Sequence, residues 1–188
     1  MNTKRVLLPY TTGVEEIECA NIVDILRRAD VEVCLASLDG APVVGRSGIH
    51  IQADAKLGDV LAEDWDMVVL AGGLPNAHLL RDCPEVQSLL QEMHRKQRHI
   101  AAICAAPVAL AAAGVIGHRR FTCYPSCEQE ILQQQTAAHY VFEQEIVCDG
   151  TLTTSQGPAT AMSFALQLVR ILCDEDKATA VQHELLHR

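Results

Sequence analysis

Positive charge is scarce in this chain, and long apolar runs are absent. Its 188 residues include 15 Lys and Arg against 24 Asp and Glu, which gives a formal net charge of −9 without any basic stripe for nucleic-acid phosphates. The first residues lead into an apolar strand rather than a signal-peptide core, and no hydrophobic run reaches membrane-spanning length. We therefore expect a soluble, cytoplasmic protein with no membrane attachment and no direct nucleic-acid binding.

Linkers, internal repeats and low-complexity tracts are absent as well. With 49% hydrophobic content, 188 residues are enough for one substantial core and too few for two comfortable domains. We expect a single domain over residues 1–188.

Disulfides and metal sites are not expected, although the chain contains eight cysteines. A chain of this size without an export signal needs no disulfides to stabilise its core, so most of these cysteines should be reduced packing residues. Cys123 and Cys127 lie four residues apart without a second Cys/His pair nearby, and His183 and His187 share one face of a terminal helix. Packed or solvated side chains explain both pairs better than zinc does. We assign no metal and no cofactor.

Apolar runs alternate with helical patterns along the chain. The runs predict buried strands at 4–9, 31–37, 66–71 and 100–103, with shorter strands or hairpins within 43–52 and 140–154. Helices are expected at 12–28, 84–98, 105–113, 127–135 and 158–173. This alternation predicts an α/β fold whose mostly parallel sheet is covered by helices on both faces. Ligands bind such sheets at the carboxyl ends of the strands.

Cys104 follows one of these strands directly and precedes the small residues Ala105 and Ala106 and then Pro107, which fits a first helical turn. A thiol near a helix N-terminus is favoured as thiolate by unpaired backbone N–H groups and the helix dipole. Sharp strand-to-helix elbows of this kind carry the nucleophile in serine hydrolases. The alternative is that Cys104 is a small buried hydrophobic residue.

Glu18 interrupts an apolar helical stripe. Thr12 and Glu15 have the form of a capping box that opens a helix running to about Arg28, and Glu18 lies four residues before Ile22 on the apolar face of that helix. A carboxyl at the edge of the stripe would reach water. A buried one would be held largely protonated, able to donate a hydrogen bond to a thiolate and to move protons on a substrate.

Gly72 and Gly73 end another apolar run. Backbone N–H groups at such a strand end are unobstructed by side chains and can stabilise negative charge on oxygen. Most glycine pairs mark ordinary turns, so this pair gains weight only because the loop after the first strand and Cys104 are expected at the same sheet edge.

Four segments together resemble the ThiJ/PfpI superfamily: 13–18 (GVEEIE), 70–73 (LAGG), 101–107 (AAICAAP) and 154–160 (TSQGPAT). Within it they resemble the branch of the Parkinsonism-associated deglycase and bacterial YajL. The resemblance runs from Arg5 to about Cys173. It implies a flavodoxin-like homodimer in which an easily oxidised cysteine, here Cys104, is paired with a protonated glutamate, here Glu18.

The resemblance also implies glutathione-independent and metal-independent action on α-oxoaldehydes such as methylglyoxal, repair of early glycation adducts, and protection against oxidative and carbonyl stress. In that reaction the Cys104 thiolate adds to the aldehyde, and amides of Gly72, Gly73 or Ala105 hold the oxyanion. Glu18 moves a proton between the former carbonyl carbons, and water cleaves the resulting thioester to a hydroxy acid. The alternative is a redox-sensing stress protein or chaperone whose Cys104 is oxidised without significant turnover.

Several positions depart from the family pattern. Ala71 replaces a proline, and Tyr124 and Gln156 stand where human-type members carry histidine and arginine. Arg46 is displaced by one position from an arginine common near the cysteine, so that Ser47 occupies its place. Superfamily proteases carry a histidine directly after the nucleophile, where this chain has Ala105, so a peptidase is not expected.

Overall fold

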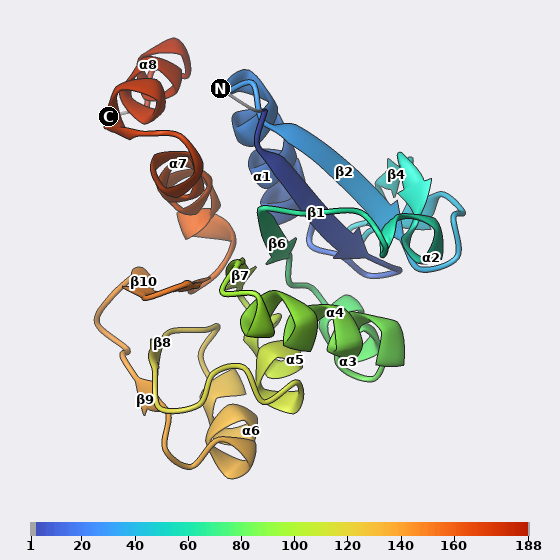
Figure 1. Ribbon diagram of the computed structural model, residues 1–188, viewed down its shortest axis with the longest axis vertical. Helices are drawn as coiled ribbons and strands as arrows, with labels where there is room; N and C mark the ends of the chain where they lie inside the picture. The colour runs from blue at the N-terminus through green and yellow to red at the C-terminus, as the bar shows by residue number, and fades with distance from the viewer. Residues whose placement is uncertain (1–2, 188) are drawn as a thin grey trace.

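The expected apolar strands form the centre of a seven-stranded sheet in a computed structural model of the protein, which describes residues 3–187 (Figure 1). The strand order is β10 (Ile146–Asp149), β11 (Leu152–Ser155), β7 (His99–Ile103), β6 (Met67–Leu70), β1 (Arg5–Tyr10), β2 (Glu32–Ser37) and β5 (Ala55–Lys56). All neighbouring pairs are parallel except β10 and β11, which form a hairpin with Gly150 at a φ of 61° in its turn.

Helices cover both faces of this sheet. The chain passes from β1 to β2 through α1 (Glu16–Arg28), and in the opposite direction across the sheet from β6 to β7 through α3 (Asn76–Arg81) and α4 (Pro84–Arg95). Since such crossovers are right-handed, the two connections lie on opposite faces. In Figure 1, α1 lies beside α7 (Ala161–Leu172), which contacts α8 (Glu175–Glu184), whereas α3 and α4 contact α5 (Pro107–Ala112). These three layers confirm the expected flavodoxin-like α/β fold.

The remaining elements are short. The antiparallel pair β3 (Val43–Val44) and β4 (His50–Ile51) confirms the hairpin expected within 43–52. A separate parallel pair joins β8 (Arg120–Phe121) to β9 (His139–Tyr140). Helices α2 (Leu57–Val60) and α6 (Cys127–Gln134) and a 3-10 turn (Pro158–Thr160) complete the fold.

Burial explains why the central strands read as unbroken apolar runs. Every residue of β6 is fully buried, as are all residues of β1 after Arg5, because parallel strands in the middle of the sheet are covered on both faces. The carboxyl ends of β1, β6 and β7 therefore meet at one edge of the sheet, beneath the N-terminus of α1.

The N-terminus of α1 differs from the expected capping box. The helix begins at Glu16, and Glu15 precedes it without a side-chain cap. Tertiary contacts fix this segment instead, since Gly13 has a φ of 80° and donates its N–H to Val44, while the N–H of Glu15 donates to the carbonyl of Gly72. The expectation of a capped helix from Thr12 was wrong because these residues form a turn against the β6–α3 loop.

Other helix boundaries also moved. The helix expected at 84–98 ends at Arg95, the one expected at 105–113 is Pro107–Ala112, and the one expected at 158–173 is divided into the 3-10 turn and α7. Helix α3 was not expected.

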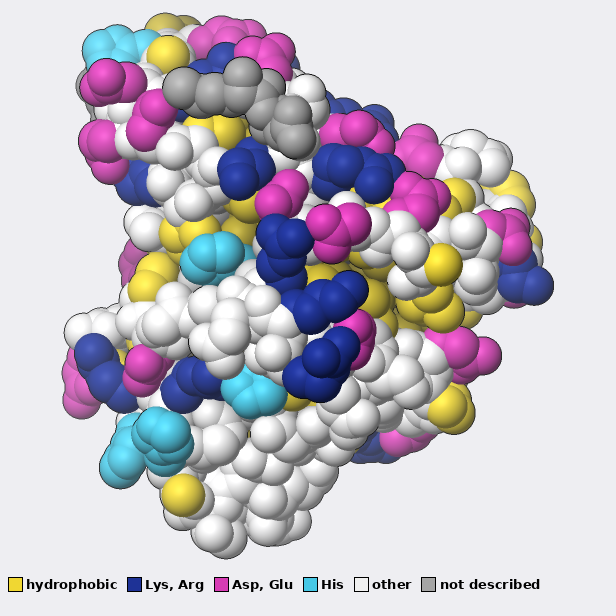
Figure 2. All heavy atoms as spheres, viewed as in Figure 1, with side chains coloured by type: hydrophobic (Ala, Val, Ile, Leu, Met, Phe, Trp, Pro, Cys, Tyr) yellow, Lys and Arg dark blue, Asp and Glu magenta, His cyan; other side chains and the backbone are white. Residues whose placement is uncertain are grey.

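Charged side chains of both signs are mixed on the surface. Figure 2 shows Lys and Arg side chains beside Asp and Glu on one face, and Arg5 is paired with both Glu32 and Glu63. No helix within residues 3–187 combines the length and apolar character needed to cross a membrane.

Candidate active site

Cys104 lies between the end of β7 and the start of α5, in a backbone conformation that cysteine rarely adopts. Its φ is 63°, in the left-handed region. Its N–H donates to the carbonyl of Ser155 over 3.0 Å, and its carbonyl accepts from the N–H of Tyr124 over 2.8 Å. Hydrogen bonds on both sides therefore hold this conformation, and 7% of the residue is exposed.

Glu18 is fully buried in the first turns of α1. Its Oε2 atom accepts from the N–H of Gly72 over 2.7 Å, while Oε1 is buried and meets no partner in good hydrogen-bond geometry. The alternative that Glu18 reaches water from the edge of the stripe is therefore wrong.

Gly72 is the point at which the two side chains converge. A Cβ atom at Gly72 would lie 2.7 Å from Cβ of Cys104, 2.9 Å from Oε2 of Glu18 and 3.0 Å from the backbone nitrogen of Ala105. No side chain other than hydrogen fits in that space. The structure thus brings together Glu18, Gly72, Cys104 and Ala105 from three segments that are distant in the sequence.

The Glu18 carboxyl is held near the midpoint of its titration at neutral pH. Burial raises its pKa to about 7, and the N–H of Gly72 and the Cys104 thiol oppose that rise in part. A substantial fraction of the molecules therefore carries a proton on Glu18 at pH 7.

Burial also raises the pKa of the Cys104 thiol, and the negative charge of Glu18 adds to this effect, while the backbone N–H groups of Ala105 and Gly73 oppose it. The expected low thiol pKa is therefore wrong. When Glu18 is protonated its charge no longer opposes ionisation of the thiol, but burial, which is the larger cause, still raises the thiol pKa.

The backbone donors at the site are already divided between two tasks. The N–H of Gly72 is engaged by Glu18. The N–H groups of Gly73 and Ala105 are those that act on the Cys104 sulfur. Of the three N–H groups expected to stabilise an oxyanion, those of Gly73 and Ala105 thus remain candidates, whereas that of Gly72 does not.

A cluster of charged side chains, from the start of α1 and the loop between β3 and β4, lies next to the site. Glu15 and Glu16 are both buried, and Arg46 contacts Oε2 of Glu15 over 3.3 Å. The positive charge of Arg46 lowers the pKa of Glu18, so this arginine acts on the site although the sequence pattern placed it one position away. Oε1 of Glu16 accepts from the N–H of Ser47 over 2.6 Å, which anchors the loop.

Two of the departures from the family pattern lie beside segments that hydrogen-bond to the backbone of Cys104. Tyr124 is 48% exposed, and its ring lies 3.4 Å from the position that a Cβ of Gly157 would take. Gln156 donates its side-chain amide to the carbonyl of Phe142 over 2.6 Å.

All eight cysteines are free thiols. Within residues 3–187, no group of three or more His, Cys, Asp or Glu side chains could hold a metal ion. Neither Cys123 and Cys127 nor His183 and His187 therefore belong to such a group.

The model of the DJ-1/PfpI family matches residues 4–171. This chain belongs to the DJ-1/PfpI family. It is 36% identical to Protein dj-1beta of Drosophila melanogaster over 98% of this chain and 97% of that protein. The crystal structure of Drosophila melanogaster DJ-1beta matches with a TM-score of 0.94 at 35% identity, covering 98% of each chain.

Two further relatives in the DJ-1/PfpI family differ in length and in name. The Glutathione-independent glyoxalase DJR-1.2 of Caenorhabditis elegans is 31% identical over 94% of this chain and 91% of that protein. Protein DJ-1 homolog B of Arabidopsis thaliana is 33% identical over the whole of this chain, which spans only 42% of that protein.

Proposed function

We propose that this DJ-1/PfpI family member is a cysteine-dependent glyoxalase and deglycase that acts on α-oxoaldehydes such as methylglyoxal, or on early glycation adducts, without glutathione or metal. The convergence of Cys104 and Glu18 at Gly72 carries this proposal, because it joins a sulfur nucleophile to a carboxyl whose pKa of about 7 lets it both give and take a proton at neutral pH. The named activity of the nematode relative supports the same substrate class.

In the proposed reaction, the Cys104 sulfur adds to the aldehyde carbon and forms a hemithioacetal. The N–H groups of Gly73 and Ala105 stabilise the oxyanion. Glu18 gives its proton to that oxyanion and becomes a carboxylate. The carboxylate then takes the proton from the former aldehyde carbon and delivers it to the neighbouring carbon, while the hydroxyl proton moves to the neighbouring oxygen, which converts the hemithioacetal to a thioester of a hydroxy acid. Water then releases the acid and restores the thiol, so methylglyoxal gives lactate. Strand-to-helix elbow geometry at Cys104 would present the sulfur to the substrate, and its positive φ supports this role.

The same groups suit the repair of early glycation adducts. In a hemiaminal between an aldehyde and a protein amine, the sulfur can attack the former aldehyde carbon, and the amine is the leaving group. The proposed role is a cytoplasmic one, in protection against carbonyl and oxidative stress.

The test is conversion of methylglyoxal to lactate by purified reduced protein in the presence of a metal chelator and without glutathione. We expect Cys104→Ser and Glu18→Gln each to lower kcat/KM by about 100-fold or more, since each removes a group that acts on the reacting atoms. Cys148→Ser and Glu92→Gln, which change an exposed residue of β10 and a half-buried residue of α4 away from the site, should retain activity.

The second candidate is a redox-sensing stress protein or chaperone in which Cys104 is oxidised and no aldehyde is turned over. The free Cys104 thiol supports this candidate, because oxidation of a thiol needs no aldehyde and no proton transfer by Glu18. Wild-type protein that forms no lactate, yet accumulates sulfinic acid at Cys104 under peroxide, would favour the sensor.

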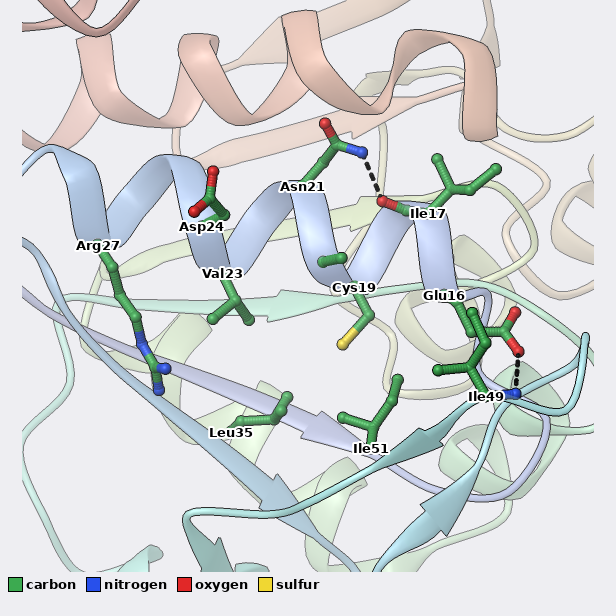
Figure 3. A pocket seen from close by; sticks show the side chains of 11 residues that line it. Glu16, Ile17, Cys19, Asn21, Val23, Asp24, Arg27, Leu35, Ile49 and Ile51 are labelled. Atoms are coloured by element: carbon green, nitrogen blue, oxygen red, sulfur yellow. Dashed lines mark hydrogen bonds between the residues drawn. The ribbon is translucent and has the colours of Figure 1, made fainter. Parts of the chain in front are cut away.

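We also propose a homodimer. A groove of about 620 Å³ runs between α1 and the β3–β4 hairpin, and Figure 3 shows Cys19, Leu35 and Ile51 facing its interior. Ile17 and Ile49 line the same groove and are 53% and 58% exposed. Exposed apolar side chains grouped along one groove in this way favour burial against a second copy of the chain.

A further inference from the structure

Two cysteines outside the proposed catalytic pair lie along the backbone that holds Cys104. The N–H of Tyr124 donates to the carbonyl of Cys104 over 2.8 Å, so Cys123 is the residue directly before that hydrogen bond. Cys104 and Cys123 are thus separated in space by this one hydrogen bond and the adjoining backbone of Tyr124, and a disulfide between them requires a Cα separation of about 4.4–6.8 Å.

Cys127 is brought to the same place by a turn. Its N–H donates to the carbonyl of Tyr124 over 3.1 Å, and Ser126 in between has a φ of 82°. Cys127 is the first residue of α6 and packs against the hydrophobic core that includes Cys123. Cys123 is fully buried whereas Cys127 is half-buried, so the turn follows an inner thiol with an outer one.

The electrostatics agree with this series. Burial raises the pKa of the Cys123 thiol, and negative charge on Cys127, Glu128 or Cys104 adds to the rise, so all three groups are within electrostatic reach of Cys123. One carboxylate oxygen of Glu128, Oε2, is buried without a hydrogen-bond partner.

We propose that Cys123 and Cys127 form a resolving thiol pair that carries oxidation away from Cys104 and ends as a Cys123–Cys127 disulfide. The oxidant is a hydroperoxide. The proposal rests on the nucleophilic character assigned to Cys104, and it does not require that aldehydes be turned over.

The chemistry balances in three steps. The Cys104 thiolate attacks hydrogen peroxide, forming a sulfenic acid and releasing hydroxide, which is protonated to water. The Cys123 sulfur attacks the sulfenic sulfur, forming a Cys104–Cys123 disulfide and releasing a second water. Cys127 then attacks the Cys123 sulfur, so that Cys104 leaves and takes up the proton that Cys127 loses. One peroxide and two thiols thus give one disulfide and two waters.

This series would protect Cys104 from further oxidation. A sulfenic acid that meets a thiol condenses to a disulfide, whereas one left exposed to peroxide proceeds to the sulfinic acid, which most proteins cannot reverse. The thiols of Cys123 and Cys127, whose pKa values are both raised by burial, stabilise their disulfide against reduction because their thiolates are poorly stabilised.

The experiment treats the reduced full chain with stoichiometric hydrogen peroxide, blocks free thiols with N-ethylmaleimide and identifies linked peptides by mass spectrometry without reduction. Wild-type protein should yield the Cys123–Cys127 disulfide and a free Cys104. Cys127→Ser should trap the Cys104–Cys123 disulfide, because the last step is removed. Cys104→Ser should leave Cys123 and Cys127 largely reduced, because the thiol that meets peroxide first is missing.

A second readout is the yield of sulfinic acid at Cys104 under excess peroxide. Cys123→Ala should raise it several-fold over wild type, and the matched control Cys148→Ser, at an exposed thiol on β10, should leave it unchanged. Two results would overturn the relay: a Cys123–Cys127 disulfide that forms as readily in Cys104→Ser as in wild type, or a Cys127→Ser protein that forms no link between Cys104 and Cys123. Because no aldehyde is present, these outcomes are independent of whether the protein makes lactate.

Discussion

Glu18 and Cys104 occupy one buried space, so the proton on either group changes the state of the other. Burial raises the pKa of Glu18 to about 7, because the folded protein disfavours the ionised carboxylate more than water does. In the unfolded chain the same carboxyl returns to its ordinary pKa of 4.5. The folded protein therefore binds more protons than the unfolded chain between these two values.

This difference predicts how stability depends on pH. The contribution of the neutral Glu18 is fully present below pH 4.5 and is lost as pH rises through about 7, a loss on the order of 3 kcal/mol at most. Glu18→Gln removes this titration. The free energy of unfolding of the variant should therefore rise relative to that of wild type when the pH is raised from 5 to 8. Urea denaturation at the two pH values measures it.

Glu92→Gln is the matched control, because Glu92 is only half-buried on α4, away from the site, and is paired with Arg95. Its difference from wild type should not follow the same course with pH. Parallel pH profiles for Glu18→Gln and wild type would show that Glu18 titrates normally.

At the scale of elements, the site depends on how closely the β6–α3 loop approaches α1 and Cys104. Gly72→Ala would place a methyl group within 3.0 Å of Cys104, Glu18 and Ala105 at once. We expect a loss of about 1–3 kcal/mol in the free energy of unfolding and the loss of most lactate formation, because the carboxyl and the sulfur are pushed apart.

Gly58→Ala provides the comparison, since a Cβ at this exposed position in α2 meets nothing within 4 Å. It should leave both stability and activity close to those of wild type. Full activity in Gly72→Ala would mean that the contact between Glu18 and Cys104 is not needed for turnover.

The elements that the sequence predicted well are those whose signal is local. Strands β1, β6 and β7 appear as apolar runs because both of their faces are covered, and Asp149 and Gly150 mark the β10–β11 hairpin directly. The start of α1 was misplaced because hydrogen bonds to Val44 and Gly72, which are distant in the chain, fix residues 13–15. Helix α3 was missed because only six residues carry it.

The same division holds for the site. Glu18 could be singled out because it breaks an apolar stripe, and Cys104 because it ends an apolar strand. The contribution of Arg46 could not be foreseen, since it depends on how the β3–β4 loop folds back on Glu15. The occupation of the Gly72 N–H by Glu18 is likewise a tertiary contact without a sequence signal.

At the scale of the whole molecule, the proposed homodimer predicts a specific effect of surface polarity. The double variant Ile17→Ser/Ile49→Ser should raise the dimer dissociation constant by about 100-fold or more, because each copy loses two apolar side chains from the interface. Analytical ultracentrifugation over a concentration series measures this.

Leu79→Ser is the control, because Leu79 is 43% exposed on α3, away from the groove. It should dimerise like wild type. A wild-type protein that sediments as a monomer at high concentration would contradict the proposal, and a double variant that dimerises normally would place the interface elsewhere.

The left-handed backbone at Cys104 has a consequence for how this chain is to be read. Any side chain at that position costs on the order of 1 kcal/mol that glycine would not, so Cys104→Gly relieves strain while deleting the sulfur. A chain selected for thermal stability alone would carry glycine there. The presence of a thiol at a strained point of the backbone marks a protein that has given up some stability in exchange for reactivity.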